Sequence, residues 1–406
     1  MLQKLYQNKK WLIVTDQVVF SGTTFLTTLV IARNLDKTSF GVFSGVILVL
    51  YFVISMISGL VIQPFQVSDQ KNKETYKSFT FWLEIVCVAL LTTILYIIFI
   101  PTKQSLNVSL WLFGVGFTLN DYARKILLSL NKLKETLYLD ILASLMQIMS
   151  ILWLIWTNLL TIENICIYQS FSYLLVILIL MTYLKPYNFN YKDWKGYWFH
   201  HIKEGKWLIM SSLVQWGASN LFVVASGVYL GVQALGALRL VQSLFGLLNM
   251  LLQVFENYII PQTSYHLSKS TTHAIGYLAH SNKQAFYWFG FILLLFTLFS
   301  ESIIVMAGGV EYAEHAFLIN GMVILYILIF INQPIRIAIR VLILNQYFFY
   351  GYLISFAFTI VSFDFMLSHW GLIGVLIGLI SSQVILILFW QTILLTKKFS
   401  IWKSFI

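Results

Sequence analysis

Long apolar segments constrain this chain more than any other feature of its sequence. A helix that crosses the hydrocarbon core of a bilayer needs about 20 apolar residues. Segments of that length lie at 11–32, 41–63, 79–100, 107–129, 137–157, 164–184, 207–228, 235–258, 285–306, 316–343, 348–367 and 371–395. Hydrophobic residues make up 59% of the chain and charged residues 10%, a composition that excludes a water-soluble fold. The sequence therefore predicts an all-α polytopic membrane protein with about twelve transmembrane helices.

The charges outside these segments predict how the chain is oriented in the membrane. Eighteen Lys and Arg residues lie in the termini and the even-numbered loops, and three lie in the odd-numbered loops. Positively charged loops stay in the cytoplasm, so we expect both termini and the even-numbered loops there. This distribution accounts for the net charge of +10 without a nucleic-acid partner. The first segment has no small-residue cleavage site, and we expect it to remain as a membrane helix and not to be removed as a signal peptide.

Four short matches recur in the same order in both halves of the chain. They are Lys-Trp-Leu-Ile at 10–13 and 206–209, a glycine-containing tetrapeptide at 40–43 and 235–238, a proline after each second segment at Pro64 and Pro261, and Asn-x-x-x-Arg at 120–124 and 332–336. Transporters are often built from duplicated helical units. We therefore predict two parallel six-helix repeats, at 1–184 and 207–406, with a central cleft between them.

Residues 185–206 join the two predicted lobes and mix basic with aromatic side chains. Aromatic rings and cations gather at the headgroup level of a bilayer. The segment is therefore predicted to be a cytoplasmic linker that lies along the inner membrane surface. A simple tether is the first interpretation, and a regulatory or lipid-sensing role is the alternative.

Arginine is used selectively, because all five arginines lie inside or at the edge of apolar segments, whereas twenty of the twenty-one lysines lie in polar loops or tails. The arginines are Arg33, Arg124, Arg239, Arg336 and Arg340. An arginine near the centre of a membrane costs at least about 2.5–3.5 kcal/mol, so one that is kept there usually faces a protein interior or a wet cavity. Its guanidinium can bind a phosphate or a carboxylate through two parallel bonds. The alternative interpretation is that these long side chains reach the headgroups at the ends of their helices.

Arg336 and Arg340 form the sharpest candidate for an anion-binding site. They are four residues apart and share one helical face. The residues before them are Asn332, Gln333 and Pro334, which supply two amides and a proline that leaves a backbone carbonyl without its helical partner. Such a carbonyl is tolerated at membrane depth only where it is buried in protein or faces water. Asn120 stands in the same relation to Arg124 as Asn332 does to Arg336.

Acidic residues also lie within the apolar segments, at Asp16, Glu84, Asp121, Asp140 and Glu256. We expect these carboxylates to pair with the arginines. Asp16 has no basic neighbour on its own helical face, so it is also the best candidate for a carboxylate that couples transport to a proton or another cation.

Motifs for catalysis and for metal binding are absent from the sequence. It contains no phosphate loop of the GxxxxGK[ST] type and no HExxH. The histidines His266, His273 and His280 recur every seven residues, and we expect them on one side of a helix, where a spacing of about 10.5 Å is too long for one shared metal. We therefore predict no metal, no bound cofactor and no enzymatic activity.

Two stretches of the chain resemble a known family of membrane proteins. The first segment runs into Leu-Val-Ile-Ala-Arg-Asn-Leu at 29–35 and then into Ser-Phe-Gly-Val-Phe at 39–43. This opening resembles that of polysaccharide and O-antigen flippases of the Wzx type, which belong to the multidrug/oligosaccharidyl-lipid/polysaccharide (MOP) exporter superfamily. The opening of the second half, with Gly236 and the run Asn-Tyr-Ile-Ile-Pro ending at Pro261, is similar to the corresponding family segment. Many family members have fourteen spans, and the twelve expected here depart from that number.

The resemblance implies a MATE-like fold, that of MOP superfamily exporters, in a bacterial plasma membrane. It also implies a cargo, an undecaprenyl-diphosphate-linked oligosaccharide, which moves from the inner to the outer leaflet by alternating access, driven by a proton or sodium gradient or by the membrane potential. Polysaccharide polymerase and chain-length proteins are the implied partners. On this interpretation Arg124, Arg336 and Arg340 receive the diphosphate, Arg33 and Arg239 accept it near the exit, and Asp16 resets the cycle.

Two other functions compete with this interpretation. The first is a cation-coupled multidrug exporter of the same superfamily, which would be expected to have an acidic cavity and not five membrane arginines. The second is an integral-membrane polysaccharide polymerase or ligase, which would need acid and base residues in a sizeable external loop. Only Glu311, Glu314 and His315 cluster on the predicted outer side, and a solvated rim accounts for them.

Overall fold

The computed structural model of the chain describes residues 2–99 and 108–399, and all regular elements in these ranges are helical. They are α1 (Leu2–Asn34), α2 (Lys37–Ile57), the π-helix η1 (Ser58–Ile62), α3 (Gln63–Val67), α4 (Glu74–Phe99), α5 (Val108–Ser129), α6 (Leu133–Trp156), α7 (Ile162–Leu184), α8 (Tyr191–Tyr229), α9 (Val232–Lys269), α10 (Thr271–Leu298), α11 (Ser300–Gly308), the 3-10 helix η2 (Val310–His315), α12 (Phe317–Val341) and α13 (Asn345–Thr396). The predicted all-α class is confirmed.

The helices coincide with the predicted membrane segments. Within the described ranges, nine helices are long and apolar enough to cross a membrane, and α10 with α11, bent by 79°, makes a tenth if the pair is one broken span. The helix α5 falls outside that set and carries Asp121, Arg124 and Lys125 in its second half. The helix α13 is 52 residues long and holds the last two predicted segments. With α5 included and α13 divided, the helices account for all twelve predicted segments of a multi-pass membrane protein.

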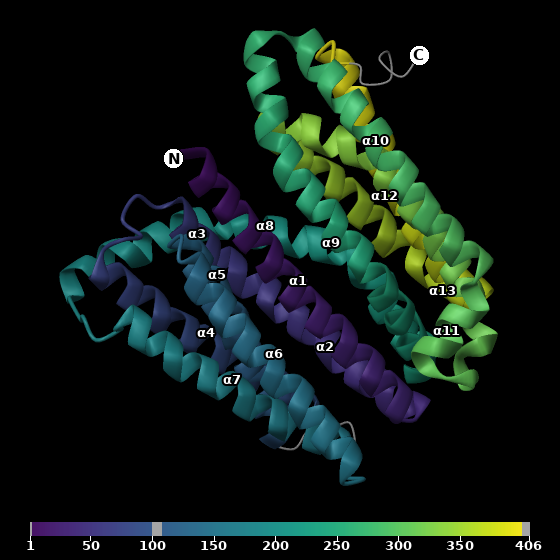
Figure 1. The fold of residues 1–406 in the computed structure, drawn as a ribbon, viewed down its shortest axis with the longest axis horizontal. Coiled ribbons are helices and arrows are strands. Elements are labelled where there is room, and N and C mark those ends of the chain that lie inside the picture. Colours follow the sequence, from purple (N-terminus) through teal and green to yellow (C-terminus); the bar gives the residue numbers. More distant parts are fainter. Residues whose placement is uncertain (1, 100–107, 400–406) are drawn as a thin grey trace. The chain divides into compact units, whose positions relative to one another are not determined.

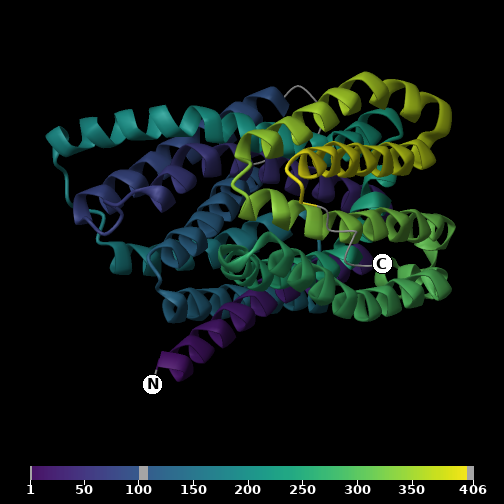
Figure 2. The same cartoon turned by 90° about the horizontal axis from the view of Figure 1, so that it is seen from above.

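The long helix α13 reverses direction at Gly371. This residue has φ 53° and ψ −131°, a backbone conformation that glycine adopts far more readily than any residue with a Cβ. The halves of α13 before and after it run side by side, as Figure 2 shows in yellow-green and yellow. Trp390 Nε1 donates a hydrogen bond of 3.0 Å to the Tyr347 carbonyl across the pair. The helix is therefore a hairpin of two antiparallel segments.

Contacts between helices divide the chain into two compact units. Unit 1 comprises Met1–Leu35 and Val46–Leu213, and unit 2 comprises Asp36–Gly45 and Val214–Ile406. In unit 1, α5 packs against α4, α6 and α7, and α1 packs against α6 (Figure 1). In unit 2, α12 packs against α9, α10 and α13. The predicted lobes at 1–184 and 207–406, with their linker at 185–206 and their cleft, remain a prediction whose boundaries differ from those of these units.

The predicted linker segment contains the first half of α8, which belongs to unit 1. The side chain of His201 is fully buried, and both of its ring nitrogens have partners. One lies 2.8 Å from the Tyr76 hydroxyl and the other 2.9 Å from the Leu60 carbonyl oxygen. Leu60 belongs to the π-helix η1, whose wider turn interrupts the regular hydrogen bonds of a helix. The histidine thus satisfies a carbonyl at this irregular turn.

The three regularly spaced histidines do not share one helix, contrary to the expectation from their spacing. Ser270 ends α9 and caps α10, and its hydroxyl accepts a hydrogen bond of 3.1 Å from the His273 backbone. His266 therefore belongs to α9, whereas His273 and His280 belong to α10. Within the described ranges, no group of three or more His, Cys, Asp or Glu side chains could hold a metal ion.

The glycine tetrapeptides that relate the two halves of the sequence meet in unit 2. A Cβ atom on Gly41 would clash with the Val232 carbonyl oxygen, and a Cβ atom on Gly236 would lie 3.0 Å from the Cα of Gly41. Beside this contact, Gln233 Nε2 donates a hydrogen bond of 2.9 Å to Thr38 Oγ1. The first turns of α2 and α9 therefore touch through their backbones, which requires glycine at both positions.

Replacement of Gly41 tests this close contact. We expect Gly41→Ala to lower the free energy of unfolding by about 1–3 kcal/mol, because the added methyl group meets backbone that cannot move aside. The matched control is Gly246→Ala in α9, where a Cβ atom meets nothing within 4 Å and the better helix former stabilises by up to about 1 kcal/mol. Thermal melting of the purified protein in detergent measures both, and equal melting temperatures for the two variants would contradict the contact.

Candidate functional site

Two arginines share one carboxylate in unit 2. Glu256 from α9 is buried, and its two oxygens accept hydrogen bonds from Arg336 and Arg340 of α12, the latter at 2.7 Å. The arginine side chains are 27% and 47% exposed, against 7% for the glutamate. Two guanidinium groups against one carboxylate leave a formal charge of +1. The cluster can therefore accept a further anion without losing its internal ion pairs.

The residues before Arg336 hold this cluster in place. Gln333 Nε2 donates to Glu256 Oε2 and to the Leu252 carbonyl, both at 3.2 Å, and its own oxygen accepts a hydrogen bond of 2.9 Å from Arg336. Among the described residues, neither Asn332 Oδ1 nor Arg336 Nε has a hydrogen-bond partner, although both atoms are buried. The buried amide therefore positions the ion pairs, and two polar atoms beside them have unused hydrogen-bonding capacity.

Unit 1 contains a cluster of the opposite charge. Arg124 of α5 donates to Asp16 of α1 at 2.7 Å and to Asp140 of α6 at 2.8 Å. Its guanidinium also donates to Gln17 Oε1 at 3.0 Å and lies 4.2 Å from the centre of the Phe20 ring. One guanidinium against two carboxylates leaves a formal charge of −1 when both are ionised. The cluster can therefore bind one proton, which neutralises it.

Asp16 uses one of its two carboxylate oxygens in this cluster. Its side chain is buried, and its Oδ1 atom has no hydrogen-bond partner in the described part of the chain. No basic residue lies within one turn of Asp16 on α1. Its basic partner is Arg124 of α5.

The expected pairing of acids with arginines is confirmed for Asp16, Asp140 and Glu256. It is wrong for Asp121, which pairs with Lys125 one turn further along α5 at 2.7 Å. Glu84 is buried, and its Oε2 atom has no partner among the described residues. Asn120 is buried one turn before Arg124, so both Asn-x-x-x-Arg motifs place their arginine in a buried cluster, although the two clusters have opposite charges.

The remaining predicted arginines lie far along their helices from these clusters. Arg33 is exposed in the last turn of α1, 17 residues after Asp16, and Arg239 is half-buried in the first turns of α9, 17 residues before Glu256. At 1.5 Å per residue, each arginine is about 25 Å along its helix from the acidic member of the cluster. Within each unit, this arginine is therefore separate from the ion-pair cluster.

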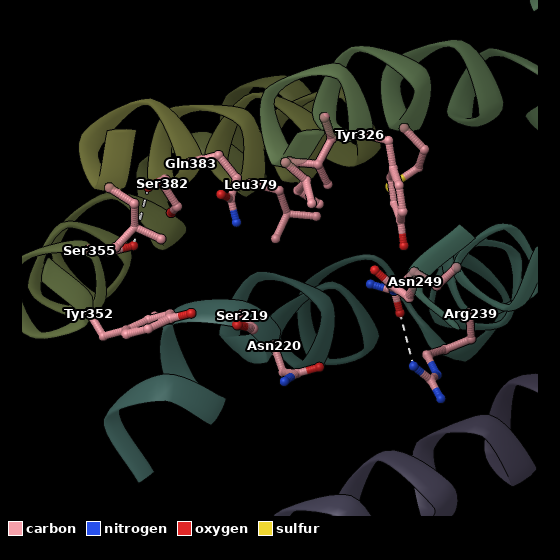
Figure 3. A pocket seen from close by; sticks show the side chains of 16 residues that line it. Ser219, Asn220, Arg239, Asn249, Tyr326, Tyr352, Ser355, Leu379, Ser382 and Gln383 are labelled. Carbon is pink, nitrogen blue, oxygen red and sulfur yellow. Dashed lines mark hydrogen bonds between the residues drawn. The ribbon is translucent and has the colours of Figure 1, made fainter. Parts of the chain in front are cut away.

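Arg239 lines a cavity of about 320 Å³ in unit 2 (Figure 3). The cavity is lined by Ala218, Ser219, Asn220, Arg239, Gln242, Asn249, Met322, Leu325, Tyr326, Ile329, Tyr352, Ser355, Leu379, Ser382, Gln383 and Leu386. Of these, sequence analysis identified Arg239 alone. The sequence does show amide and hydroxyl side chains within the apolar spans of α8, α9 and α13. The pattern along each single helix, however, does not show that these side chains meet in one cavity.

The predicted external group of Glu314 and His315 forms part of a surface ion-pair cluster. Lys37 donates a hydrogen bond of 2.9 Å to Glu314, which lowers the pKa of that carboxyl. His315 lies 3.5 Å from the same carboxylate, and burial lowers the pKa of its ring. These contacts account for both residues as parts of a structural cluster at the ends of α2 and η2.

Solved structures of transporters have the same fold as this chain. A MOP superfamily transporter from Pyrococcus furiosus, for which a reversed polarity of the binding pocket was taken to suggest a different function, aligns with 96% of this chain and 95% of its own at a TM-score of 0.63 and 12% identity. An inward-facing multidrug resistance MATE family transporter of the same superfamily aligns with 96% of this chain and 95% of its own, at a TM-score of 0.64 and 13% identity. The eukaryotic MATE transporter AtDTX14 aligns with 96% of this chain and 95% of its own, at a TM-score of 0.59 and 11% identity.

These likenesses confirm the predicted architecture, because the alignments cover nearly the whole length of both chains. At such low identity they show the fold alone, which is that of MATE and other MOP superfamily transporters. No family model and no curated protein sequence matches the chain.

Arg124 is expected to be essential for the stability of unit 1. Replacing it by Ala leaves two buried carboxylates facing each other, and breaking a buried ion pair from one side costs about 3–5 kcal/mol. Lys125→Ala on the same helix removes a more exposed pair with Asp121 and should cost about 1 kcal/mol or less. Membrane abundance and thermal melting in detergent measure both changes. Adding Asp16→Asn and Asp140→Asn to Arg124→Ala should restore part of the loss, and no restoration would show that charge is not the cause.

Proposed function

We propose that this chain is a flippase that moves an undecaprenyl-diphosphate-linked oligosaccharide from the inner to the outer leaflet of a bacterial plasma membrane, for the assembly of O-antigen, capsule or another surface polysaccharide. The observation that carries the proposal is the pair Arg336 and Arg340, which shares the single carboxylate of Glu256. The MOP transporter fold supports a transport function, and the excess positive charge supports an anionic cargo.

The arginine pair suits a diphosphate for two reasons. Guanidinium groups bind phosphate oxygens through parallel hydrogen bonds, which are stronger than bonds between neutral groups. Arg340 is 47% exposed and Arg336 is 27% exposed, so a ligand can reach them while Glu256 still orients them from behind. Both lie in the second half of α12, which is the predicted cytoplasmic end of that helix. A lipid made on the inner leaflet would therefore reach them first.

Arg33 and Arg239 would act at the opposite end of the path. Each lies about 25 Å along its helix from a cluster, close to the thickness of about 30 Å of the hydrocarbon core. On this proposal, the diphosphate leaves Arg336 and Arg340 and is met near the outer leaflet by further guanidinium groups. A role for Arg124 and Asn120 in cargo binding stays a prediction, since Arg124 already binds two carboxylates.

The cluster of Asp16, Arg124 and Asp140 is proposed to couple transport to a proton gradient. Its formal charge of −1 becomes zero when one proton binds, and Arg124 is then held by one carboxylate in place of two. Such a change in ion pairing can bias a helix bundle between two arrangements. A sodium gradient and the membrane potential are the competing driving forces.

A cation-coupled multidrug exporter is the second candidate function. The acidic excess of unit 1 favours it, because a carboxylate is the group that an organic cation would need. The arginine pair of unit 2 opposes it, since guanidinium groups repel such a substrate. Partners of a flippase would include the lipid bilayer and the polysaccharide polymerase and chain-length proteins that use its product.

Deletion and substitution of the arginines separate these functions. In a deletion strain, lipid-linked repeat units should accumulate on the inner leaflet and surface glycan should be lost. Arg336→Ala and Arg340→Ala should each reduce surface glycan at least about tenfold at normal protein abundance, because each removes charge-assisted bonds to the diphosphate. Lys at either position should restore only part of the surface glycan, since lysine keeps the positive charge but lacks the planar pair of donors of a guanidinium. Full glycan with normal abundance, or sensitivity of the deletion strain to cationic drugs alone, would overturn the flippase proposal.

Substitution of the coupling carboxylate tests the driving force. In proteoliposomes that carry the lipid-linked oligosaccharide, an imposed pH gradient should accelerate flipping by the unaltered protein, and Asp16→Asn should remove that acceleration. The amide keeps the shape and leaves Arg124 paired with Asp140. Asp121→Asn, which removes a carboxylate outside the cluster, is the control and should keep the response. A response to a sodium gradient alone, or one that survives in Asp16→Asn, would contradict proton coupling at this residue.

A further inference from the structure

The cavity in unit 2 is unusually polar for a ligand pocket. Pockets for small molecules are lined mainly by apolar and aromatic side chains with few polar groups. Ten of the sixteen residues that line this cavity are polar, namely Ser219, Asn220, Arg239, Gln242, Asn249, Tyr326, Tyr352, Ser355, Ser382 and Gln383. A lining of this kind is poorly suited to an apolar drug and well suited to a ligand that makes many hydrogen bonds.

The polar groups come from four helices and face the same space. Figure 3 shows Ser219 and Asn220 of α8 and Asn249 and Arg239 of α9 on one side, with Gln383 of α13 and Tyr326 of α12 opposite them. These side chains offer hydroxyl and amide groups that both donate and accept, together with two tyrosine rings. Sugar rings present the complementary set, because their hydroxyls donate and accept and their carbon faces stack on aromatic rings.

Arg239 is the only charged residue among the sixteen that line the cavity. Its Nη1 atom donates a hydrogen bond of 3.0 Å to Gln242 Oε1, which fixes the orientation of the guanidinium. The planar fork of a guanidinium fits the two oxygens of a carboxylate. The guanidinium can therefore bind one carboxylate group within the cavity.

We propose that this cavity binds an acidic sugar residue of the lipid-linked glycan, with its carboxylate on Arg239 and its hydroxyls on the surrounding amides and hydroxyls. The inference rests on the proposed function and deepens it, since it assigns the glycan to a cavity distinct from the diphosphate site. It also gives Arg239 a role in selecting the cargo, in place of accepting the diphosphate at the exit.

The cavity and the arginine pair both include residues of α12 in unit 2. Tyr326 and Arg336 are ten residues apart on α12, which corresponds to about 15 Å. Two side chains of the lining reach toward the arginines, because Tyr352 interacts with Arg336 and Gln383 accepts a hydrogen bond of 3.5 Å from Asn332. A cargo whose diphosphate is bound at Arg336 and Arg340 can therefore extend its glycan along α12 to the cavity.

A pair of matched probes tests the inference on the full-length purified protein in nanodiscs. Methyl glucuronide and methyl glucoside differ only in the carboxylate, and their binding is measured by calorimetry. We expect the glucuronide to bind about tenfold to a hundredfold more tightly, as charge-assisted bonds to one guanidinium allow. Arg239→Gln should remove this preference and leave the weaker glucoside binding. Equal binding of the two probes by the unaltered protein would overturn the inference.

A second variant keeps the test decisive if Arg239→Gln does not fold. Gln242→Glu preserves the shape of the side chain that accepts the bond from Arg239 and places a carboxylate beside the guanidinium, where it competes with the carboxylate of a bound sugar. It should abolish the preference for the glucuronide at an unchanged melting temperature. Persistence of the preference in this variant would show that the anion binds elsewhere.

Arg336→Gln separates this inference from the proposed function. It should weaken binding of undecaprenyl diphosphate, measured in the same nanodiscs, and keep the preference for the glucuronide. Loss of that preference in Arg336→Gln would place the carboxylate at the arginine pair and overturn the inference alone. Normal glycan export in the deletion strain would instead overturn the flippase proposal, whatever the sugar probes show.

Discussion

A charged side chain in a bilayer must find an opposite charge or water, and this requirement organises both units of the protein. Arg124 meets two carboxylates from neighbouring helices, and Arg336 and Arg340 meet one. Each pairing ties together helices that are distant in the sequence, since Asp16 and Arg124 are 108 residues apart and Glu256 and Arg340 are 84 apart. Because removing one member would leave a buried charge without a partner, these ion pairs constrain the packing of α1 with α5 and of α9 with α12.

The two clusters each contain the arginine of an Asn-x-x-x-Arg motif and have opposite formal charges. The Asn-x-x-x-Arg motif of α5 ends in a cluster with one excess carboxylate, and that of α12 ends in a cluster with one excess guanidinium. An excess carboxylate can take up a proton, whereas an excess guanidinium can take up a phosphate. A transporter with this pair of clusters would have both a coupling site and a cargo site. The flippase proposal uses both, whereas a drug exporter would leave the arginine pair without a role.

Sequence patterns predicted some features of this chain correctly and others wrongly. The length of each apolar run predicted the helices, and the reversal of α13 falls at the first residue of the last predicted segment, Gly371, which adopts a positive φ. The seven-residue spacing of the histidines was misleading, because the Ser270 cap begins a new helix within the repeat. The sequence of its own helix gave Asp16 no basic neighbour, yet Arg124 of α5 pairs with it. Periodicity describes neighbours along one helix, and it carries no information about the helix packed against it.

Local sequence was enough to predict a bundle of membrane helices and to show that the arginines are set apart from the lysines. Helix formation at membrane depth follows from local composition, since every backbone polar group must be satisfied within its own segment. Only the tertiary structure decided which carboxylate meets which arginine, that Gly41 and Gly236 touch, and that ten polar side chains from four helices line one cavity around Arg239. These facts depend on packing between helices, where the partners are separated by dozens of residues and no local pattern records the distance between them.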